Sequence, residues 1–255
     1  MTSERPAGRT VYITGASDGI GAALARKMSQ EGYAVGLIAR RAEMLEAVAA
    51  ELTGPNAWAV ADVGDNDALT GALARLQTAL PPPDIAVANA GISLPDGDAL
   101  ETAAAMARVN YLGTVHLFNH VLPAMLARGG GQVVAVSSLA GLVGFPGKVG
   151  YCGSKAAVER FVEACRPELR RKGVFVTLVR PGGVNTAIIK GNQYPGPFNV
   201  EPDHAAARIH RAIERRQRLC EFPWQHSVAI RIARLLPEAL RGRISLRKEP
   251  TSSAD

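Results

Sequence analysis

The chain has 255 residues, 47% of them apolar and 20% charged, which is ordinary for a globular protein of one α/β domain. No apolar run reaches the roughly 18 residues that span a bilayer, and residues 1–10 lack the apolar stretch of a secretory signal. The three cysteines are few, odd in number and widely spaced, which argues against a disulfide framework or metal site and favours a cytoplasmic protein. The net charge of +6 is concentrated near the C-terminus, where residues 208–248 carry 11 basic and three acidic side chains.

Apolar runs alternate with stretches of helical period, which predicts a parallel sheet covered by helices on both faces. Strands are expected at 11–13, 34–39, 57–61, 85–88, 132–136 and 174–179, with helices at 19–31, 42–52, 65–80, 109–127 and 151–171. No linker or repeat interrupts this order. We therefore expect residues 1–255 to form one Rossmann-like, doubly wound α/β domain, with residues 249–255 disordered.

A glycine-rich turn follows the first expected strand and opens the first expected helix. Gly15, Gly19 and Gly21 lie in the run Thr14–Gly21, TGASDGIG. A helix N-terminus attracts phosphate through its free amides and dipole, and glycine lets the backbone approach closely. The turn therefore predicts a dinucleotide site, although an ordinary glycine-rich loop would also fit this motif taken alone.

A second group of residues is typical of proton transfer. Tyr151 and Lys155 are four residues apart in an expected helix, so both project from one face, and a nearby cation favours a phenolate. Ser138 ends the strand before them, and we prefer it to Ser137 because strand alternation points the two serines in opposite directions. Asn110 lies between the two motifs and is a further candidate, although it could simply cap the helix that it is expected to open. Taken alone, Tyr151 could also be a tyrosine on a helix surface and Ser138 a serine at a strand end.

Together with Asn89-Ala90-Gly91, these motifs resemble the short-chain dehydrogenases/reductases from Thr10 to about Thr186. The resemblance implies a catalytic set in which Tyr151 exchanges the proton, Lys155 lowers the tyrosine pKa and binds ribose, Ser138 orients the substrate, and Asn110 holds a water. It also implies that Asp62 meets the adenine and that Thr186 meets the nicotinamide carboxamide. The implied cofactor-binding residues are Gly15, Ser17, Asp18, Gly19, Ile20, Gly21, Arg40, Arg41, Asp62, Val63, Asn89, Ala90, Gly91, Tyr151, Lys155, Pro181, Gly182, Val184 and Thr186.

The end of the second strand bears on the choice of nicotinamide cofactor. A carboxylate there would accept from the 2′-hydroxyl of NAD, but this chain has Arg40 and Arg41, which suit the 2′-phosphate of NADP. Asp18 stands where some NADP-preferring relatives carry a basic residue. We predict a preference for NADP(H), with NAD(H) as the alternative; the two arginines could also simply solvate the next helix.

Beyond the sixth strand, the resemblance implies a lid at residues 187–200, where Ile188, Ile189, Tyr194 and Phe198 would join Leu94 and Phe145 around a fairly apolar substrate. Residues 222–248 form a basic amphipathic segment, with a helix expected at 226–236. Its apolar face comprises Val228, Ile232, Leu235 and Leu236, beside Arg231 and Arg234. This face could dock on the core, which we favour, contact another subunit, or bind anionic lipid. Nucleic-acid binding is not expected, because no known nucleic-acid-binding motif accompanies these basic residues.

These expectations combine into an NADPH-dependent oxidoreductase that interconverts a ketone or aldehyde and an alcohol, with Tyr151 as general acid/base. The glycine spacing and the lack of a larger C-terminal domain disfavour a sugar-nucleotide epimerase. The alternative from another class is a catalytically silent cofactor-binding regulator or scaffold. The resemblance further implies a homodimer or homotetramer packed through the helices expected at 109–127 and 151–171.

Overall fold

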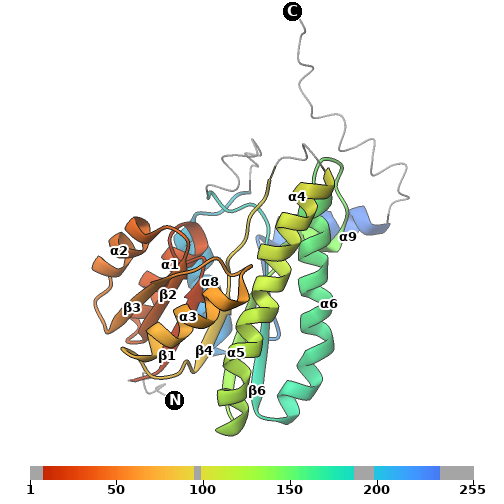
Figure 1. Cartoon of the computed structure of the whole chain (residues 1–255). Coiled ribbons are helices and arrows are strands. Elements are labelled where there is room, and N and C mark those ends of the chain that lie inside the picture. Colours follow the sequence, from red (N-terminus) through yellow and green to blue (C-terminus); the bar gives the residue numbers. More distant parts are fainter. Residues whose placement is uncertain (1–7, 95–98, 187–197, 236–255) are drawn as a thin grey trace, which may run out of the picture.

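The computed structural model describes residues 8–94, 99–186 and 198–235, in which helices cover both faces of one sheet (Figure 1). All strand pairings are parallel, and the strand order is β3-β2-β1-β4-β5-β6-β7. The predicted doubly wound α/β fold is confirmed. The strands are β1 (Thr10–Thr14), β2 (Ala34–Ala39), β3 (Asn56–Val60), β4 (Ile85–Ala88), β5 (Gly131–Val136), β6 (Val174–Pro181) and β7 (Leu219–Phe222).

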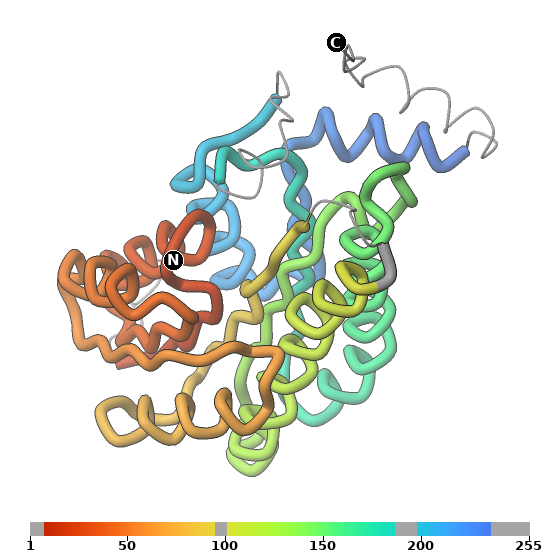
Figure 2. Tube along the Cα trace, turned by 45° about the horizontal axis from the view of Figure 1, so that its top comes forward, coloured from red at the N-terminus to blue at the C-terminus, as the bar shows by residue number. Residues whose placement is uncertain are grey.

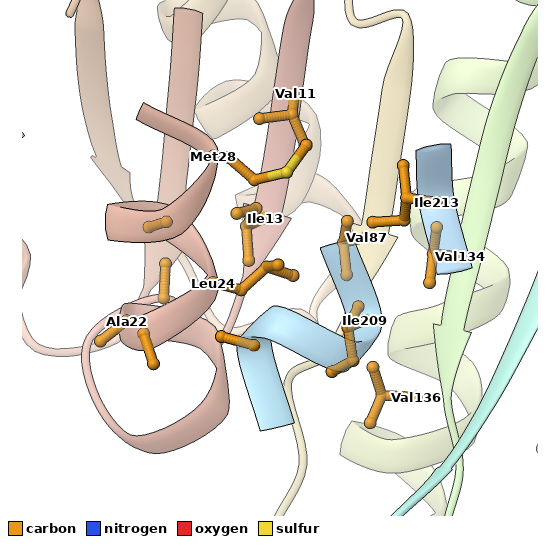
Figure 3. Close-up of a cluster of buried hydrophobic side chains, with 14 of the residues drawn as sticks. Val11, Ile13, Ala22, Leu24, Met28, Val87, Val134, Val136, Ile209 and Ile213 are labelled. Atoms are coloured by element: carbon orange, nitrogen blue, oxygen red, sulfur yellow. The ribbon is translucent and has the colours of Figure 1, made fainter. Parts of the chain in front are cut away.

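Two hydrophobic layers hold the helices on the sheet. Alternate residues of a strand point to opposite faces, so Val11 and Ile13 of β1 enter one layer and Tyr12 enters the other. The first layer is covered by α1 (Gly19–Gln30), α2 (Ala42–Ala50) and α8 (Pro202–Glu214), and the second by α3 (Asn66–Gln77), α5 (Gly113–Ala127) and α6 (Val149–Arg171). Figure 3 shows the first layer, where Leu24 and Ile209 from α1 and α8 meet over the strands.

The helix expected at 109–127 begins earlier than predicted. Helix α4 (Ala99–Met106) leads into a π-helical turn, η1 (Ala107–Leu112), and then into α5. Asn110 therefore lies inside a helical run, and its interpretation as a helix cap is wrong. A π-helical turn inside an α-helix inserts a residue and is frequent at functional sites.

Strand β7 and helix α8 were not predicted. The β7 segment, Leu219–Phe222, is only four residues long and follows a run of arginines, so its apolar pattern is weak. It completes the sheet beside β6, where Val179 pairs with Cys220. The expected strand at 174–179 in turn extends to Pro181, because β7 provides it with a partner.

Helix α9 (Trp224–Leu235) packs on the fold through a different face from the one expected. Val228, Ile232 and Leu235 are 44%, 58% and 85% exposed, whereas Ser227 is buried. Core docking through the apolar row is therefore wrong for these residues, and Leu236 lies outside the described part of the chain. Contact with another subunit or with lipid stays a prediction. Within the described residues, no helix is long and apolar enough to cross a bilayer.

Candidate active site

The order of the strands predicts a cleft at the carboxyl ends of the central strands. Chain order reverses between β1 and β4, and ligands of open α/β sheets bind outside the carboxyl ends of the strands at such a point. A cleft opens there. Of the residues predicted from the sequence, it is lined by Gly15, Ser17, Asp18, Gly19, Ile20, Arg40, Arg41, Asp62, Val63, Asn89, Ala90, Gly91, Tyr151, Lys155, Pro181 and Thr186.

Other residues line this cleft without having been predicted: Ala39, Ala61, Ile92, Val109, Val136 and Ser137. Two of them, Ala39 and Val136, are the last residues of β2 and β5. The rule that ligands lie at the carboxyl ends of strands would have found these two. Ala61, which ends the strand expected at 57–61, and Ser137, which directly follows β5, are accessible to the same rule. Ile92 and Val109 depend on loop and helix placement, for which the sequence carries no signal of its own.

The glycine turn is shaped for close approach to the backbone. Gly15 has a φ of +66°, and a Cβ added there would lie 2.7 Å from the Cα of Ala90. A Cβ on Gly21 would lie 2.6 Å from Nδ2 of Asn89, whose side chain donates to the carbonyl oxygens of Thr14 and Gly15 at 2.9 and 3.2 Å. The first helix begins at Gly19, so its free amides face this turn. These features fit a pyrophosphate.

The two predicted arginines stand at the end of β2, where they line the cleft. Arg41 donates to the Ser17 hydroxyl at 3.1 Å and lies 3.7 Å from the carboxylate of Asp18. Arg40 lies 4.0 Å from the carboxylate of Asp62. Both arginines remain more than half exposed, so each can still meet an anion from solvent. Asp18, which looked unfavourable for NADP, caps the first helix by accepting from the Gly19 amide at 2.6 Å.

Tyr151, Lys155 and Ser138 converge from two elements. The first two lie one turn apart on α6, and the Lys155 ammonium is 5.9 Å from the centroid of the Tyr151 ring. Ser138 follows β5, hydrogen-bonds Tyr151, and accepts from the amide of Ala140 at 3.1 Å. The neighbouring serine, Ser137, donates instead to the Lys155 carbonyl at 3.0 Å. The two serines therefore do have different partners, as strand alternation predicts.

Burial shifts the pKa values of both titratable groups. It raises the pKa of Tyr151 above its ordinary value, and the hydrogen bond with Ser138 lowers it by less. Burial also lowers the pKa of Lys155 from 10.5 to about 8. The lowering of the tyrosine pKa expected from Lys155 is therefore not the dominant influence here. Lys155 donates to the carbonyl of Val136 at 2.9 Å, and an ammonium has three donors, so it can also bind a ribose hydroxyl.

Asn110, in the π-helical turn, hydrogen-bonds two elements beside the cleft. Its Oδ1 accepts from the amide of Ile92 at 2.7 Å, and its Nδ2 donates to the Ile92 carbonyl at 3.0 Å and to the Ser154 hydroxyl at 2.9 Å. It thus links the loop after β4 to α6. A Cβ on Gly91 would lie 3.3 Å from both Asn110 and Lys155, so a glycine there keeps the two groups accessible to each other.

The remaining predicted residues lie in or beside the segment after β6. Pro181 and Thr186 line the cleft, while Gly182 packs against His226 and Val184 is buried in a bridge with Val200. A Cβ on Gly19 would lie 2.9 Å from Cγ2 of Thr186, so this segment reaches back to the glycine turn.

Of the expected lid, 187–200, only 198–200 lies within the described residues, and Ile188, Ile189 and Tyr194 fall outside them. In the described part of the chain, Leu94 and Phe145 are not among the residues that line this cleft. The prediction of an apolar substrate therefore stays open.

Comparison with known proteins identifies the family. The family model described as short chain dehydrogenase matches residues 9–194. The chain is a short-chain dehydrogenase/reductase. As a member, it is an NAD(P)-dependent oxidoreductase that acts on CH–OH and C=O groups, and the recognition made from its motifs is confirmed.

Relatives of this dehydrogenase extend over most of the chain. An uncharacterised oxidoreductase of Myxococcus xanthus is 35% identical and covers 91% of this chain and 94% of its own. A serine 3-dehydrogenase of Agrobacterium fabrum is 38% identical over 79% of this chain and 86% of its own.

Solved structures agree with the fold. A closed form of serine dehydrogenase complexed with NADP⁺ is 27% identical, has a TM-score of 0.77, and covers 85% of this chain and 95% of its own. A family member from Burkholderia phymatum in complex with NAD has a TM-score of 0.83 over 99% of both chains, and at 21% identity it supports the fold alone.

Proposed function

We propose that this dehydrogenase is an NADP(H)-dependent enzyme that reduces a ketone or aldehyde, or oxidises the matching alcohol, with Tyr151 as general acid/base. The observation that carries the proposal is the convergence of Tyr151 and Lys155, with Ser138 beside Tyr151, in a cleft that the glycine turn also lines. A dinucleotide laid along this cleft would span from the turn to the tyrosine.

The bound cofactor supplies the hydride that reduces the carbonyl carbon. In that direction the Tyr151 hydroxyl gives its proton to the carbonyl oxygen, and the raised pKa keeps this hydroxyl protonated at neutral pH. Ser138 orients the carbonyl through its own hydroxyl. Lys155 binds the nicotinamide ribose and favours the phenolate that remains after proton transfer. Asn110 holds a water that returns a proton toward this group.

The two arginines at the end of β2 support the preference for NADP(H). A guanidinium pairs with a phosphate dianion, and no carboxylate follows β2 directly to accept from a ribose hydroxyl. Arg40→Ala and Arg41→Ala should each weaken NADPH binding about tenfold or more while changing NADH binding little. Equal affinities of the unmodified enzyme for the two cofactors, unchanged by either substitution, would overturn the preference.

Substrate and assembly are proposed more broadly. The apolar residues of the expected lid favour an apolar ketone or alcohol, whereas the serine 3-dehydrogenase relative brings small hydroxy acids into consideration. We also propose a cytoplasmic homodimer or homotetramer, packed through α5 and α6 as in the family resemblance.

The test measures NADPH consumption across ketones, aldehydes, steroids, quinones and 3-oxoacyl thioesters, and NADP⁺ reduction with serine and other hydroxy acids. Tyr151→Phe is assayed in parallel, and Tyr111→Phe, which removes a hydroxyl elsewhere, serves as the control. We expect turnover that Tyr151→Phe reduces by at least about a thousandfold and that Tyr111→Phe leaves unchanged. Tight NADPH binding without turnover on any substrate would favour the silent regulator, and turnover that survives Tyr151→Phe would contradict the proposed role.

A further inference from the structure

His226, on α9, touches the segment that follows β6. Its Nδ1 accepts a hydrogen bond from the amide of Gly183 at 3.2 Å. The contact is close, because a Cβ on the preceding Gly182 would lie 2.6 Å from the same nitrogen. The amide of Gly182 in turn donates to the carbonyl of Phe222 at 2.7 Å, so the start of this segment is fastened to the corner between β7 and α9.

The same imidazole also contacts the far side of the expected lid. The Phe198 ring meets it edge-on, with centroids 6.0 Å apart and planes at 77°. The chain before the expected lid is bonded to the last residue of that lid, since the amide of Val200 donates to the Gly183 carbonyl at 3.0 Å and the amide of Asn185 donates to the Val200 carbonyl at 2.9 Å. His226 therefore lies where the chain leaves for the lid and where it returns.

A chain of ion pairs connects α9, the helix that carries His226, to α6, the helix that carries Tyr151 and Lys155. Arg231 of α9 pairs with Glu221 of β7 at 2.6 Å, and Glu221 lies 3.8 Å from Arg180 of β6. Arg180 donates to Glu159 of α6 at 2.8 Å, and the Glu159 side chain is only 1% exposed. Figure 2 shows α9, in blue, passing the green loop before α6, consistent with its contacts to residues 139–142.

We propose that His226 is a positioning residue, whose neutral imidazole holds the Pro181–Thr186 segment over the nicotinamide end of the cleft. The inference rests on the proposed function, because it assigns a task to the segment that is expected to meet the nicotinamide. The Nδ1 can accept from Gly183 only when the ring is neutral and its proton is on Nε2. Burial lowers the pKa of His226, which favours this neutral form. Thr186, three residues beyond Gly183, reaches the glycine turn. If the Gly183 end of this segment moved, Thr186 would move with it and lose its expected contact with the nicotinamide carboxamide.

Two substitutions separate the effect of the hydrogen bond to Gly183 from the effect of ring packing against Phe198. His226→Phe keeps a ring against Phe198 and removes the acceptor, whereas His226→Asn places an amide oxygen near the position of Nδ1 and removes the ring. His210→Phe is the matched control, because His210 is also partly buried by the fold and meets an aromatic ring, that of Tyr33, edge-on at 6.4 Å.

The experiment measures hydrogen exchange of the Gly183 amide in the cofactor-free chain, NADPH affinity by fluorescence titration, and kcat and KM. For His226→Phe we expect exchange about five- to tenfold faster, NADPH affinity weakened by a similar factor and a raised KM, from the loss of one hydrogen bond. His226→Asn should restore most of the affinity, and His210→Phe should leave all three readouts unchanged.

Unchanged exchange and affinity in His226→Phe would overturn the inference. Equal losses in the Phe and Asn variants would also overturn it, since ring packing alone would then explain the contact. Failure of the unmodified chain to bind NADPH would overturn the proposed function, and the exchange measurement, which uses no cofactor, decides the role of His226 separately.

Discussion

Replacing Lys155 by methionine should change how the free energy of unfolding depends on pH, because burying the Lys155 ammonium destabilises the folded state. The Lys155 side chain is buried, and its pKa falls from 10.5 to about 8. In the unfolded chain the ammonium keeps its proton up to the ordinary value. Between these two values the unfolded state binds more protons, so the stability of the natural chain rises with pH relative to a variant that lacks the group. The complete shift corresponds to about 3 kcal/mol.

The assay compares urea unfolding of the natural chain and of Lys155→Met at about pH 7 and about pH 9.5, without cofactor. We expect the natural chain to gain about 2 kcal/mol relative to the variant between these conditions. Lys172→Met, at the exposed end of the same helix, is the control for exchanging lysine for methionine, and any pH dependence it shows is subtracted. A difference between natural chain and variant that stays constant with pH would refute the reasoning, because the buried amine would then titrate alike in both states.

Three further predictions concern the turn, a buried ion pair and the proton donor. Gly21→Ala should destabilise the fold by about 1–3 kcal/mol and abolish NADPH binding, because the added Cβ meets the backbone of the glycine turn. The control is Gly71→Ala, whose Cβ would meet nothing within 4 Å and should have neither effect; thermal unfolding and cofactor titration measure both variants. Glu159→Gln should cost about 3 kcal/mol in urea unfolding, since it removes the buried carboxylate that accepts from Arg180 and leaves only Glu221, 3.8 Å away, to balance this charge. The raised pKa of Tyr151 keeps its hydroxyl protonated at neutral pH, so kcat/KM for alcohol oxidation should rise with pH while that for carbonyl reduction falls; a profile rising with pH in both directions would contradict this.

The sequence predicted the fold wherever the pattern was local. Buried strands such as Ala34–Ala39 appear as continuous apolar runs, and their alternation with helices leaves few topologies. Helix α4 was missed because Ala99–Met106 is mostly alanine and shows little contrast between apolar and polar faces, although Asp98 and Glu101 have the spacing of a capping box in the sequence. The exposed apolar row of α9 was assigned to the core because periodicity shows that one face is apolar and does not show what covers it.

The candidate site divides in a similar way. Gly15, Tyr151 and Lys155 could be predicted, because turn chemistry and helical spacing act over a few residues. The contact of His226 with Gly183 joins residues 43 positions apart and depends on the packing of β7 and α9. A histidine in an amphipathic helix carries no such signal in the sequence. The direction of the Tyr151 pKa shift also needed the structure, since burial raises this pKa by more than the hydrogen bond with Ser138 lowers it.

The most direct test of the account follows a hydride. With NADPH carrying deuterium at the transferable C4 position and a substrate found by the turnover panel, the product alcohol is analysed by mass spectrometry. The account predicts one deuterium on the carbinol carbon in the natural chain and almost no product in Tyr151→Phe. Product without deuterium, or deuterated product formed equally well by Tyr151→Phe, would contradict the proposed hydride transfer with Tyr151 as the proton donor.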